Sequence, residues 1–373
     1  MFARLKPPFR ADHVGSLIRP DALIRARQAA EKAEIAPAEL ARIQHDAIRE
    51  VVRLQEEIGF RLATDGEYNR NTWQRDFLLK FSNVREGTAK LTVRFHTAAG
   101  TRDRAPPLLQ VTGKLARPGG IFVDDFRFLT SVTKATAKVT IPSPTTIHFR
   151  GGRGAIDAKA YPDLAEFYAD LARVYREEIH DLAEAGCRYL QIDEVNLAYL
   201  CDPALRAQVR NIGEDPDTLP QTYARLLNDT IADRPADMVV CMHLCRGNFA
   251  GAWIAEGGYD PIAEILFNEI GVDGYFLEYD SPRAGGFAPL RFLPKGKIAV
   301  LGLITTKNAA LESKDDIKRR IDEASRYVGI DQLALSPQCG FSSGIAGNAV
   351  TVADEIAKLK LVVEVAEDVW GSA

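Results

Sequence analysis

The chain has 373 residues, enough for one large domain or two ordinary ones. Apolar residues make up 46% of it and the formal net charge is −4, so it is typical of a globular protein and offers no general attraction to nucleic acid or an anionic membrane. Its five cysteines show no disulfide-framework spacing and fit a reducing compartment. We therefore expect a cytoplasmic protein with no nucleic-acid or membrane partner.

Short apolar segments alternate with amphipathic helices along most of the chain. The predicted strands are 13–17, 60–64, 139–144, 188–194, 236–245, 275–278, 297–304 and 333–340. Apolar residues at helical spacing predict helices between them, most clearly in 40–58 and 163–185. This order predicts an α/β fold, a (β/α)8 TIM barrel that forms one catalytic domain over residues 1–373. A doubly wound open sheet is the alternative, but neither a dinucleotide-binding glycine motif nor a P-loop follows any strand.

One segment departs from the alternation. Residues 76–138 contain Leu91, Val93 and Phe95 alternating with polar residues, and lysines and arginines are scattered through the segment. Such alternation is typical of a half-buried strand. We predict a β-rich excursion over 76–138, inserted between the second and third strands, that acts as a lid or as a contact in a homo-oligomer. A solvated, charged hairpin explains the same pattern.

Polar residues recur where the predicted strands end. They are Ser16, Glu67, Asp193, Glu194, His243, Cys245, Glu278 and Cys339. In a (β/α)8 barrel the C-terminal strand ends carry the chemistry, so a barrel places these residues at one rim. Side chains alternate along a strand, so only one of Asp193 and Glu194 can face the barrel interior. Glu194 then either contacts substrate or has a supporting role such as capping a helix.

Four of these residues carry side chains that zinc accepts. His243 and Cys245 lie two apart at the end of strand 236–245 and point the same way, and two other apolar strands end in Glu278 and Cys339. Imidazole, thiolate and carboxylate together predict a zinc site. Each residue alone has a simpler explanation, because a lone cysteine is usually a small buried side chain and Glu278 could be an ion-pair partner. Cys241 shares the same strand face, so a role as ligand or near-ligand stays open for it.

Six motifs, taken in chain order, resemble the C-terminal catalytic half of cobalamin-independent methionine synthase. They are Val-Gly-Ser at 14–16, Asp-Gly-Glu at 65–67, Gln-Ile-Asp-Glu at 191–194, His-Leu-Cys at 243–245 with Gly247 and Asn248, Glu278, and Pro-Gln-Cys-Gly at 337–340. The resemblance runs from residue 10 to the end of the chain. In length and opening sequence the chain is most similar to the short, single-barrel members, which include methionine synthase-like proteins and epoxyalkane:coenzyme M transferases.

The resemblance implies a zinc ligand set of His243, Cys245, Glu278 and Cys339, and a thiol substrate that joins the metal. It also implies that Ser16 and Glu67 hold an amino acid substrate, with Asp193 on its amino group. The chemistry agrees, because two carboxylates beside an ammonium form charge-assisted hydrogen bonds. We therefore predict that Glu67 and Asp193 act in catalysis and, with Ser16 and Glu194, in substrate binding.

Two loops depart from the family pattern. Full-length methionine synthases carry an Asp-x-His segment after strand seven, whose histidine is a proposed acid for the folate leaving group, whereas residues 302–308 here contain no histidine. Their Trp-containing folate-contact loop after strand three is replaced by residues 144–150. The methyl donor is therefore left unspecified. Lys307 and His148 are candidate proton donors to the leaving group, and either could equally be a surface residue.

These observations predict an enzyme of methionine biosynthesis, a zinc-dependent methyltransferase whose partners are a small-molecule thiol and a methyl or alkyl donor. Zinc would ionise the thiol near neutral pH, and Glu278 is the ligand expected to yield to the substrate sulfur. Homocysteine is the favoured acceptor because Glu67 and Asp193 suit its ammonium group. One alternative is epoxyalkane:coenzyme M transfer, in which a sulfonate needs cationic partners. Another is a metal-free barrel similar to uroporphyrinogen decarboxylase.

Overall fold

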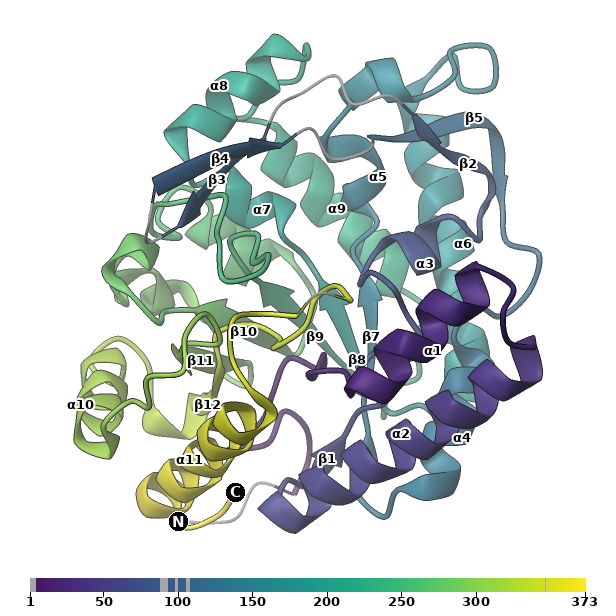
Figure 1. Ribbon diagram of the computed structural model, residues 1–373. Helices are drawn as coiled ribbons and strands as arrows, with labels where there is room; N and C mark the ends of the chain where they lie inside the picture. The colour runs from purple at the N-terminus through teal and green to yellow at the C-terminus, as the bar shows by residue number, and fades with distance from the viewer. Residues whose placement is uncertain (1–4, 88–92, 98–99, 105–107, 346) are drawn as a thin grey trace.

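A parallel six-stranded sheet forms the centre of the protein (Figure 1). The computed structural model describes residues 5–87, 93–97, 100–104, 108–345 and 347–373. The strands lie in chain order and every neighbouring pair is parallel; they are β7 (Val139–Pro142), β8 (Tyr189–Asp193), β9 (Val239–Leu244), β10 (Gly274–Glu278), β11 (Ile298–Ile304) and β12 (Leu333–Pro337). All residues of these strands are buried except the first of β9, as expected for a parallel sheet covered on both faces.

Two further parallel contacts involve the segments that adjoin this sheet. β1 (Leu62–Ala63) pairs in parallel with β6 (Thr136–Ala137), which is separated from β7 by a single residue, Lys138. At the other end, Ala11 forms a parallel bridge with Leu335 of β12. The residue that pairs here lies two positions before the first predicted strand, 13–17.

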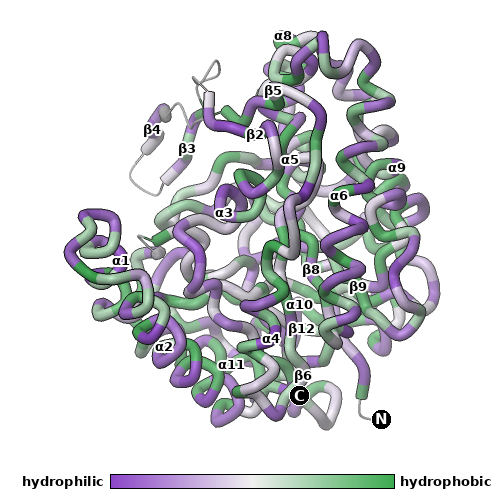
Figure 2. Tube along the Cα trace, turned by 90° about the vertical axis from the view of Figure 1, so that its right-hand side faces the viewer, coloured by the Kyte–Doolittle hydropathy of each residue, from purple (hydrophilic) through white to green (hydrophobic). Residues whose placement is uncertain are grey.

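Helices surround the strands (Figure 1). They are α1 (Asp21–Glu31), α2 (Pro37–Ile58), α3 (Arg75–Leu78), α4 (Val123–Val132), α5 (Thr145–Phe149), α6 (Leu164–Glu184), α7 (Asn196–Tyr199), α8 (Pro203–Asn211), α9 (Leu219–Ile231), α10 (Lys314–Ala324) and α11 (Val352–Trp370). Figure 2 shows hydrophobic strands inside and helices of mixed hydropathy around them, which is the pattern of amphipathic helices packed on a buried sheet. None of the helices in the described residues is long and apolar enough to cross a membrane.

Lys138 ties the first segment of the chain to the sheet. Its ammonium group is fully buried and donates to Asp12 at 3.0 Å and to the carbonyl of His13 at 2.6 Å. The hydroxyl of Tyr189 on β8 donates to the other oxygen of Asp12 at 2.7 Å. A buried charge is tolerated only when it is paired and hydrogen-bonded, so this network fixes the segment that leads to Ser16.

The β-rich part of segment 76–138 consists of two antiparallel ribbons. β2 (Ser82–Gly87) pairs with β5 (Leu108–Ala116), and β3 (Val93–Thr97) pairs with β4 (Gly100–Arg104). The rest of the predicted excursion includes most of α3 before the ribbons, and α4 and β6 after them, so the ribbons themselves end at Ala116. Leu91, part of the alternating pattern, lies outside the described residues.

The ribbon β3–β4 contacts the loop that follows β9. His96 and Trp253 exchange two backbone hydrogen bonds, of 2.7 and 3.0 Å, and the rings of Phe95 and Phe249 lie 5.7 Å apart. This part of the excursion is therefore joined to a loop at the carboxyl end of the central sheet.

Glu355 on α11 holds the loop that follows Ser16, and its charge state gives a testable pH dependence. Its carboxylate accepts a hydrogen bond from the backbone N–H of Ile18 at 2.8 Å, and burial raises its pKa to about 8, from an ordinary value of 4.5. Between these two pH values the folded state keeps a proton that the unfolded state has lost. The contribution of Glu355 to the free energy of unfolding therefore falls as the pH rises from 4.5 to 8.

The variant Glu355→Gln is neutral at every pH and can still accept the Ile18 hydrogen bond. We expect its stability relative to the wild type to increase steadily across that pH window and then to level off. Urea unfolding at several pH values measures the difference. A difference that is independent of pH would contradict the buried, protonated carboxyl group.

Candidate metal centre and adjoining cavity

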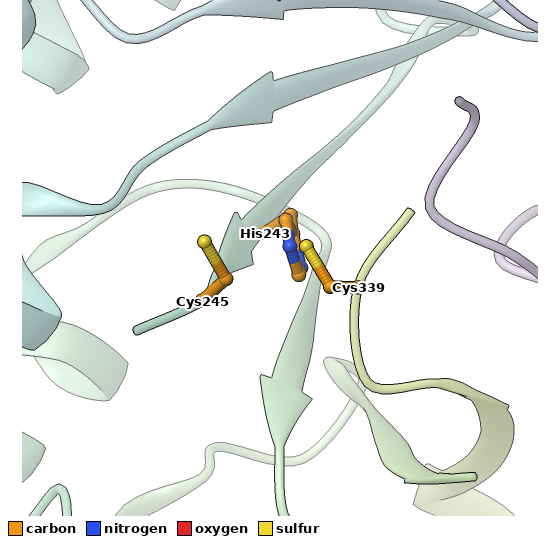
Figure 3. A group of neighbouring side chains, drawn as sticks. All are labelled: His243, Cys245 and Cys339. Carbon is orange, nitrogen blue, oxygen red and sulfur yellow. The ribbon is translucent and has the colours of Figure 1, made fainter. Parts of the chain in front are cut away.

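Three predicted metal ligands come together at the carboxyl end of the sheet (Figure 3). His243 lies in β9, Cys245 follows the strand directly, and Cys339 reaches the same point from the loop after β12. One potential ligand atom from each residue lies within 4.8 Å of the other two, and all three residues are buried. Nitrogen and sulfur donors in this number are the set that zinc binds in proteins.

The immediate surroundings of the three side chains fit a bound cation. Neither ring nitrogen of the buried His243 has a hydrogen-bond partner among the described residues. The pKa of Cys245 lies well below its usual range, because the thiol of Cys339 and the imidazole of His243 stabilise its thiolate. Burying an imidazole with no partner is costly, and a metal ion would satisfy it together with both sulfurs.

Glu278, the fourth predicted ligand, lies near this group but outside it. One carboxylate oxygen accepts from the backbone N–H of Arg246 at 2.9 Å, and the other contacts Arg283 and, at 3.3 Å, Lys307. Burial alone would raise the pKa of Glu278, but Lys307, Arg283 and Arg246 outweigh it and lower the pKa to about 2. The carboxylate is ionised, and its role as a ligand stays a prediction.

A cavity of about 510 Å³ opens beside the three metal-ligand candidates and contains most of the other predicted site residues. Glu67, Asp193 and Ser16 line it together with His243, Cys245 and Cys339. Asp193 lies directly beside His243, because the two residues are register partners of β8 and β9. The parallel register therefore brings a carboxylate and a metal-ligand candidate side by side.

Glu67 and Asp193 form an acidic wall. Burial and then the charge of Glu67 raise the pKa of Asp193 to about 7, and Gln191 donates to Asp193 at 2.7 Å. One oxygen of Glu67 accepts from Thr140 at 2.8 Å, whereas the other is buried without a partner among the described residues. Glu67 also has a φ of 60°, an uncommon backbone conformation for a residue other than glycine that is often retained at functional sites. This wall is suited to a cationic group that supplies the missing partner.

Ser16 is packed against the segment that carries Cys339. A Cβ atom on Gly340 would lie 1.9 Å from the Ser16 hydroxyl oxygen, so glycine is required there. The backbone N–H of Phe341 donates to the carbonyl of Ser16 at 2.9 Å. Ser16 is thereby held within the cavity wall, close to the third ligand candidate.

Glu194 does not line the cavity. Its carboxylate accepts from the hydroxyls of Ser143 and Thr145 and from the backbone N–H groups of Asn196 and Leu197, at the start of α7. Alternation along β8 explains why Asp193 faces the cavity and Glu194 faces away. The placement argues against direct contact between Glu194 and a substrate, and for the helix-capping alternative.

The two proton-donor candidates are engaged outside the cavity wall. His148 is fully buried and lies 3.0 Å from the hydroxyl of Tyr223 and 3.3 Å from Glu214. Lys307 contacts both Glu278 and Asp280. Neither residue is among those that line the cavity.

Several cavity residues had no role in the sequence prediction. They are the aromatic residues Trp73, Tyr199 and Phe249, with Phe95 from the β3–β4 ribbon, and the cations Arg75 and Arg150. All of them except Phe95 come from loops or short helices, where the sequence has no periodic pattern to show which way a side chain points. Tyr199 lies shortly after the end of a predicted strand, and this position was the one feature of the sequence that could have indicated a cavity residue.

Comparisons with known proteins agree with this geometry. The family described as cobalamin-independent synthase, catalytic domain, matches residues 9–368. The chain is 44% identical to protein YxjG of Bacillus subtilis (strain 168), over 98% of this chain and 96% of that protein, and 26% identical to a methionine synthase of Pyrococcus abyssi, over 88% and 84%.

A similar solved structure is that of a Listeria monocytogenes protein, provisionally assigned as a vitamin B12-independent methionine synthase. It is 35% identical to this chain, covers 99% of it and all of its own length, and has a TM-score of 0.77. The family predicted from the six sequence motifs is confirmed. The chain belongs to the catalytic-domain family of the cobalamin-independent methionine synthases.

Proposed function

We propose that this protein is a zinc-dependent methyltransferase that converts homocysteine to methionine. The observation that carries the proposal is one continuous cavity wall in which two carboxylates lie beside a buried group of one imidazole and two cysteine sulfurs. A thiol amino acid carries an ammonium group at one end and a sulfur at the other. The two carboxylates would pair with the ammonium group, and a metal held by the imidazole and the cysteines would bind the sulfur. The family membership supports the same reaction class.

His243, Cys245 and Cys339 would hold the metal, and Glu278 is proposed as a fourth, exchangeable ligand. When bound, zinc supplies a positive charge that lowers the pKa of a nearby thiol, so that the thiolate predominates at neutral pH. Arg283 and Lys307 hold Glu278 ionised beside the group. They also provide an alternative partner for its carboxylate, as an exchangeable ligand requires.

The acidic wall orients the substrate. The ammonium group of homocysteine would lie between Glu67 and Asp193, where it pairs with the free oxygen of Glu67. Ser16, next to Cys339, would accept or donate a hydrogen bond to the polar end of the amino acid. Because Asp193 is the register neighbour of His243, an amino acid bound here directs its side chain towards the two cysteines.

The transfer itself is a displacement at carbon. A lone pair of the homocysteine sulfur forms a bond to the methyl group, and the bond between the methyl group and the donor breaks with its electron pair going to the leaving atom. The chain's contribution is to hold the sulfur and the methyl carbon in line and to keep water away from the reacting sulfur. Phe95, from the ribbon formed by β3 and β4, is one of the residues that line the cavity.

We also propose that the fold is a closed (β/α)8 barrel. The parallel bridge between Ala11 and Leu335 and the parallel pairing of β1 with β6 support it, since they add two segments to the six-stranded sheet. Thr64 further contacts the carbonyl of Gly15 at 2.7 Å, between the two added segments. A barrel would bring the six predicted site residues that line the cavity to one rim; they are Ser16, Glu67, Asp193, His243, Cys245 and Cys339.

Two other functions fit the chain less well. A coenzyme M-dependent epoxide transferase would leave Asp193 and one oxygen of Glu67 without a partner from the substrate, and unpaired buried carboxylate oxygens are costly. A metal-free decarboxylase-like barrel would not need two cysteines and an imidazole in contact. Purified protein with less than about half an equivalent of zinc, prepared without chelator, would favour the metal-free alternative.

The cysteine ligands give a first prediction for this function. We expect Cys245→Ser and Cys339→Ser each to lower zinc affinity by more than about 100-fold. Substituting a residue that only hydrogen-bonds to a metal ligand already lowers metal affinity by up to about 100-fold, and loss of a ligand should cost more. Metal titration with a chromophoric chelator measures the affinity. Cys241→Ala is the matched control, since Cys241 is buried on the same strand beside Tyr189 and outside the group. Equal loss of zinc in all three variants would contradict the ligand assignment.

The acidic wall gives a second prediction. We expect Glu67→Gln to raise the KM for homocysteine by about 10- to 100-fold, because a charge-assisted hydrogen bond to the ammonium is lost. 4-Mercaptobutyrate, which lacks the ammonium group, is the control substrate and should be used equally by both proteins. Steady-state kinetics with the two thiols makes the comparison. An unchanged KM for homocysteine would remove Glu67 from the substrate site.

A further inference from the structure

The cavity contains a second region that the acceptor thiol does not use. Besides the two acids, one of which is the register partner of His243, the described lining residues include four aromatic side chains and Arg150. A substrate that binds here faces a chemical environment opposite to that of the acidic wall. The second substrate of a transfer reaction, the methyl donor, must also reach the sulfur from within this cavity.

Arg150 is available to bind an anion. No ion pair joins it to a carboxylate of the described residues, whereas Arg75, the other arginine of the cavity, is paired with Glu86 at 2.6 Å. Arg150 instead lies beside the hydroxyl of Tyr199. An arginine that lines a cavity and has no acidic partner is well suited to a carboxylate of a ligand.

Arg150 is also linked to the candidate metal centre through neighbouring residues. The hydroxyl of Tyr199, beside Arg150, lies against Gly247, because a Cβ atom added to Gly247 would be 2.5 Å from its oxygen. The backbone nitrogen of Gly247 in turn lies 3.5 Å from the sulfur of Cys245. A ligand whose carboxylate reaches Arg150 and whose methyl group reaches the metal centre is therefore small.

The aromatic residues indicate the charge of the group that carries the methyl. Trp73, Phe95, Tyr199 and Phe249 line the same cavity, and the rings of Phe95 and Phe249 are in contact at 5.7 Å. Aromatic faces attract cations, and clusters of them are a common site for quaternary ammonium groups. Sulfonium and quaternary ammonium groups can also donate a methyl group without protonation of the leaving atom.

Apart from Asp193 in the acidic wall, few groups that line the cavity could protonate a departing nitrogen or oxygen. Among the described lining residues there is no lysine, and the single histidine is His243 of the metal centre. A sulfonium or quaternary ammonium donor avoids this requirement, because it departs as a neutral sulfide or tertiary amine.

We propose that the methyl donor is a small zwitterion, a methylsulfonium or methylammonium group carrying a carboxylate, with the carboxylate on Arg150 and the cation against the aromatic side chains. This inference rests on the proposed function and specifies its second substrate. The homocysteine thiolate forms the new S–CH3 bond, and the old C–S or C–N bond gives its electron pair to the leaving sulfur or nitrogen. Charge balances without a proton or an oxidant, since an anion and a cationic group become two uncharged groups.

The test uses zinc-loaded, full-length protein and calorimetric titration with glycine betaine and with choline, which has the same cation but no carboxylate. We expect Arg150→Gln to weaken binding of glycine betaine by about tenfold or more, and binding of choline by less than about twofold. Arg150→Lys, which keeps the charge, should retain most of the affinity. Arg85→Gln, at an exposed arginine of β2, is the matched control and should behave as the wild type. Thermal unfolding establishes that each variant is folded.

A companion assay measures methionine formed from deuterated homocysteine with S-methylmethionine, dimethylsulfoniopropionate, glycine betaine or 5-methyltetrahydrofolate. We expect at least one zwitterionic donor to support turnover that Arg150→Gln reduces. If homocysteine binds but none of these zwitterions binds or reacts, the donor inference is wrong and the proposed function stands. If Arg150→Gln weakens homocysteine and glycine betaine equally, Arg150 belongs to the acceptor site and the inference is again wrong. If homocysteine itself does not bind, the proposed function falls.

Discussion

The register of parallel strands is the constraint on which the site depends. Alternation along β9 directs His243 and Cys245 the same way, and the pairing of β8 with β9 sets Asp193 beside His243. The loop after β12 then brings Cys339 within 4.8 Å of both ligand candidates. A shift of one residue in either pairing would turn an acid or a ligand away from the cavity. The strand register therefore determines which side chains form the site.

Buried charge explains much of what surrounds the site. The thiolate of Cys245, Glu278 and the acids of the wall place several anionic groups in one buried region, where water screens them poorly. Arg283 and Lys307 offset Glu278, and Arg70 lies 3.5 Å from Glu67. A divalent cation at the cysteines and an ammonium at the wall would balance the remainder, so the proposed ligands and the protein's own electrostatics are consistent with each other.

Much of this arrangement could be predicted from the sequence. Motifs at strand ends identified the family, which the comparisons confirm. The same motifs identified six residues that line the cavity, three of which form the candidate metal centre. The rule that side chains alternate left Glu194 with two roles, and the structure places it at the start of α7. Glu278 could not be positioned in advance, because its carboxylate depends on Arg283 and Lys307, which approach from two later loops. Arg150, Trp73 and Tyr199 were missed for a related reason, since non-periodic segments do not indicate which side chains face a cavity. Within the predicted β-rich excursion, the two ribbons are followed by α4 and β6, and its role as a lid or oligomer contact stays a prediction.

X-ray absorption at the zinc K edge, before and after addition of homocysteine, tests the central claim most directly. The account predicts close to one equivalent of zinc, with two sulfur neighbours at about 2.3 Å in the free protein. Addition of homocysteine should raise the number of sulfur neighbours to three. Zinc without sulfur neighbours, or a sulfur count that homocysteine does not change, would contradict the account.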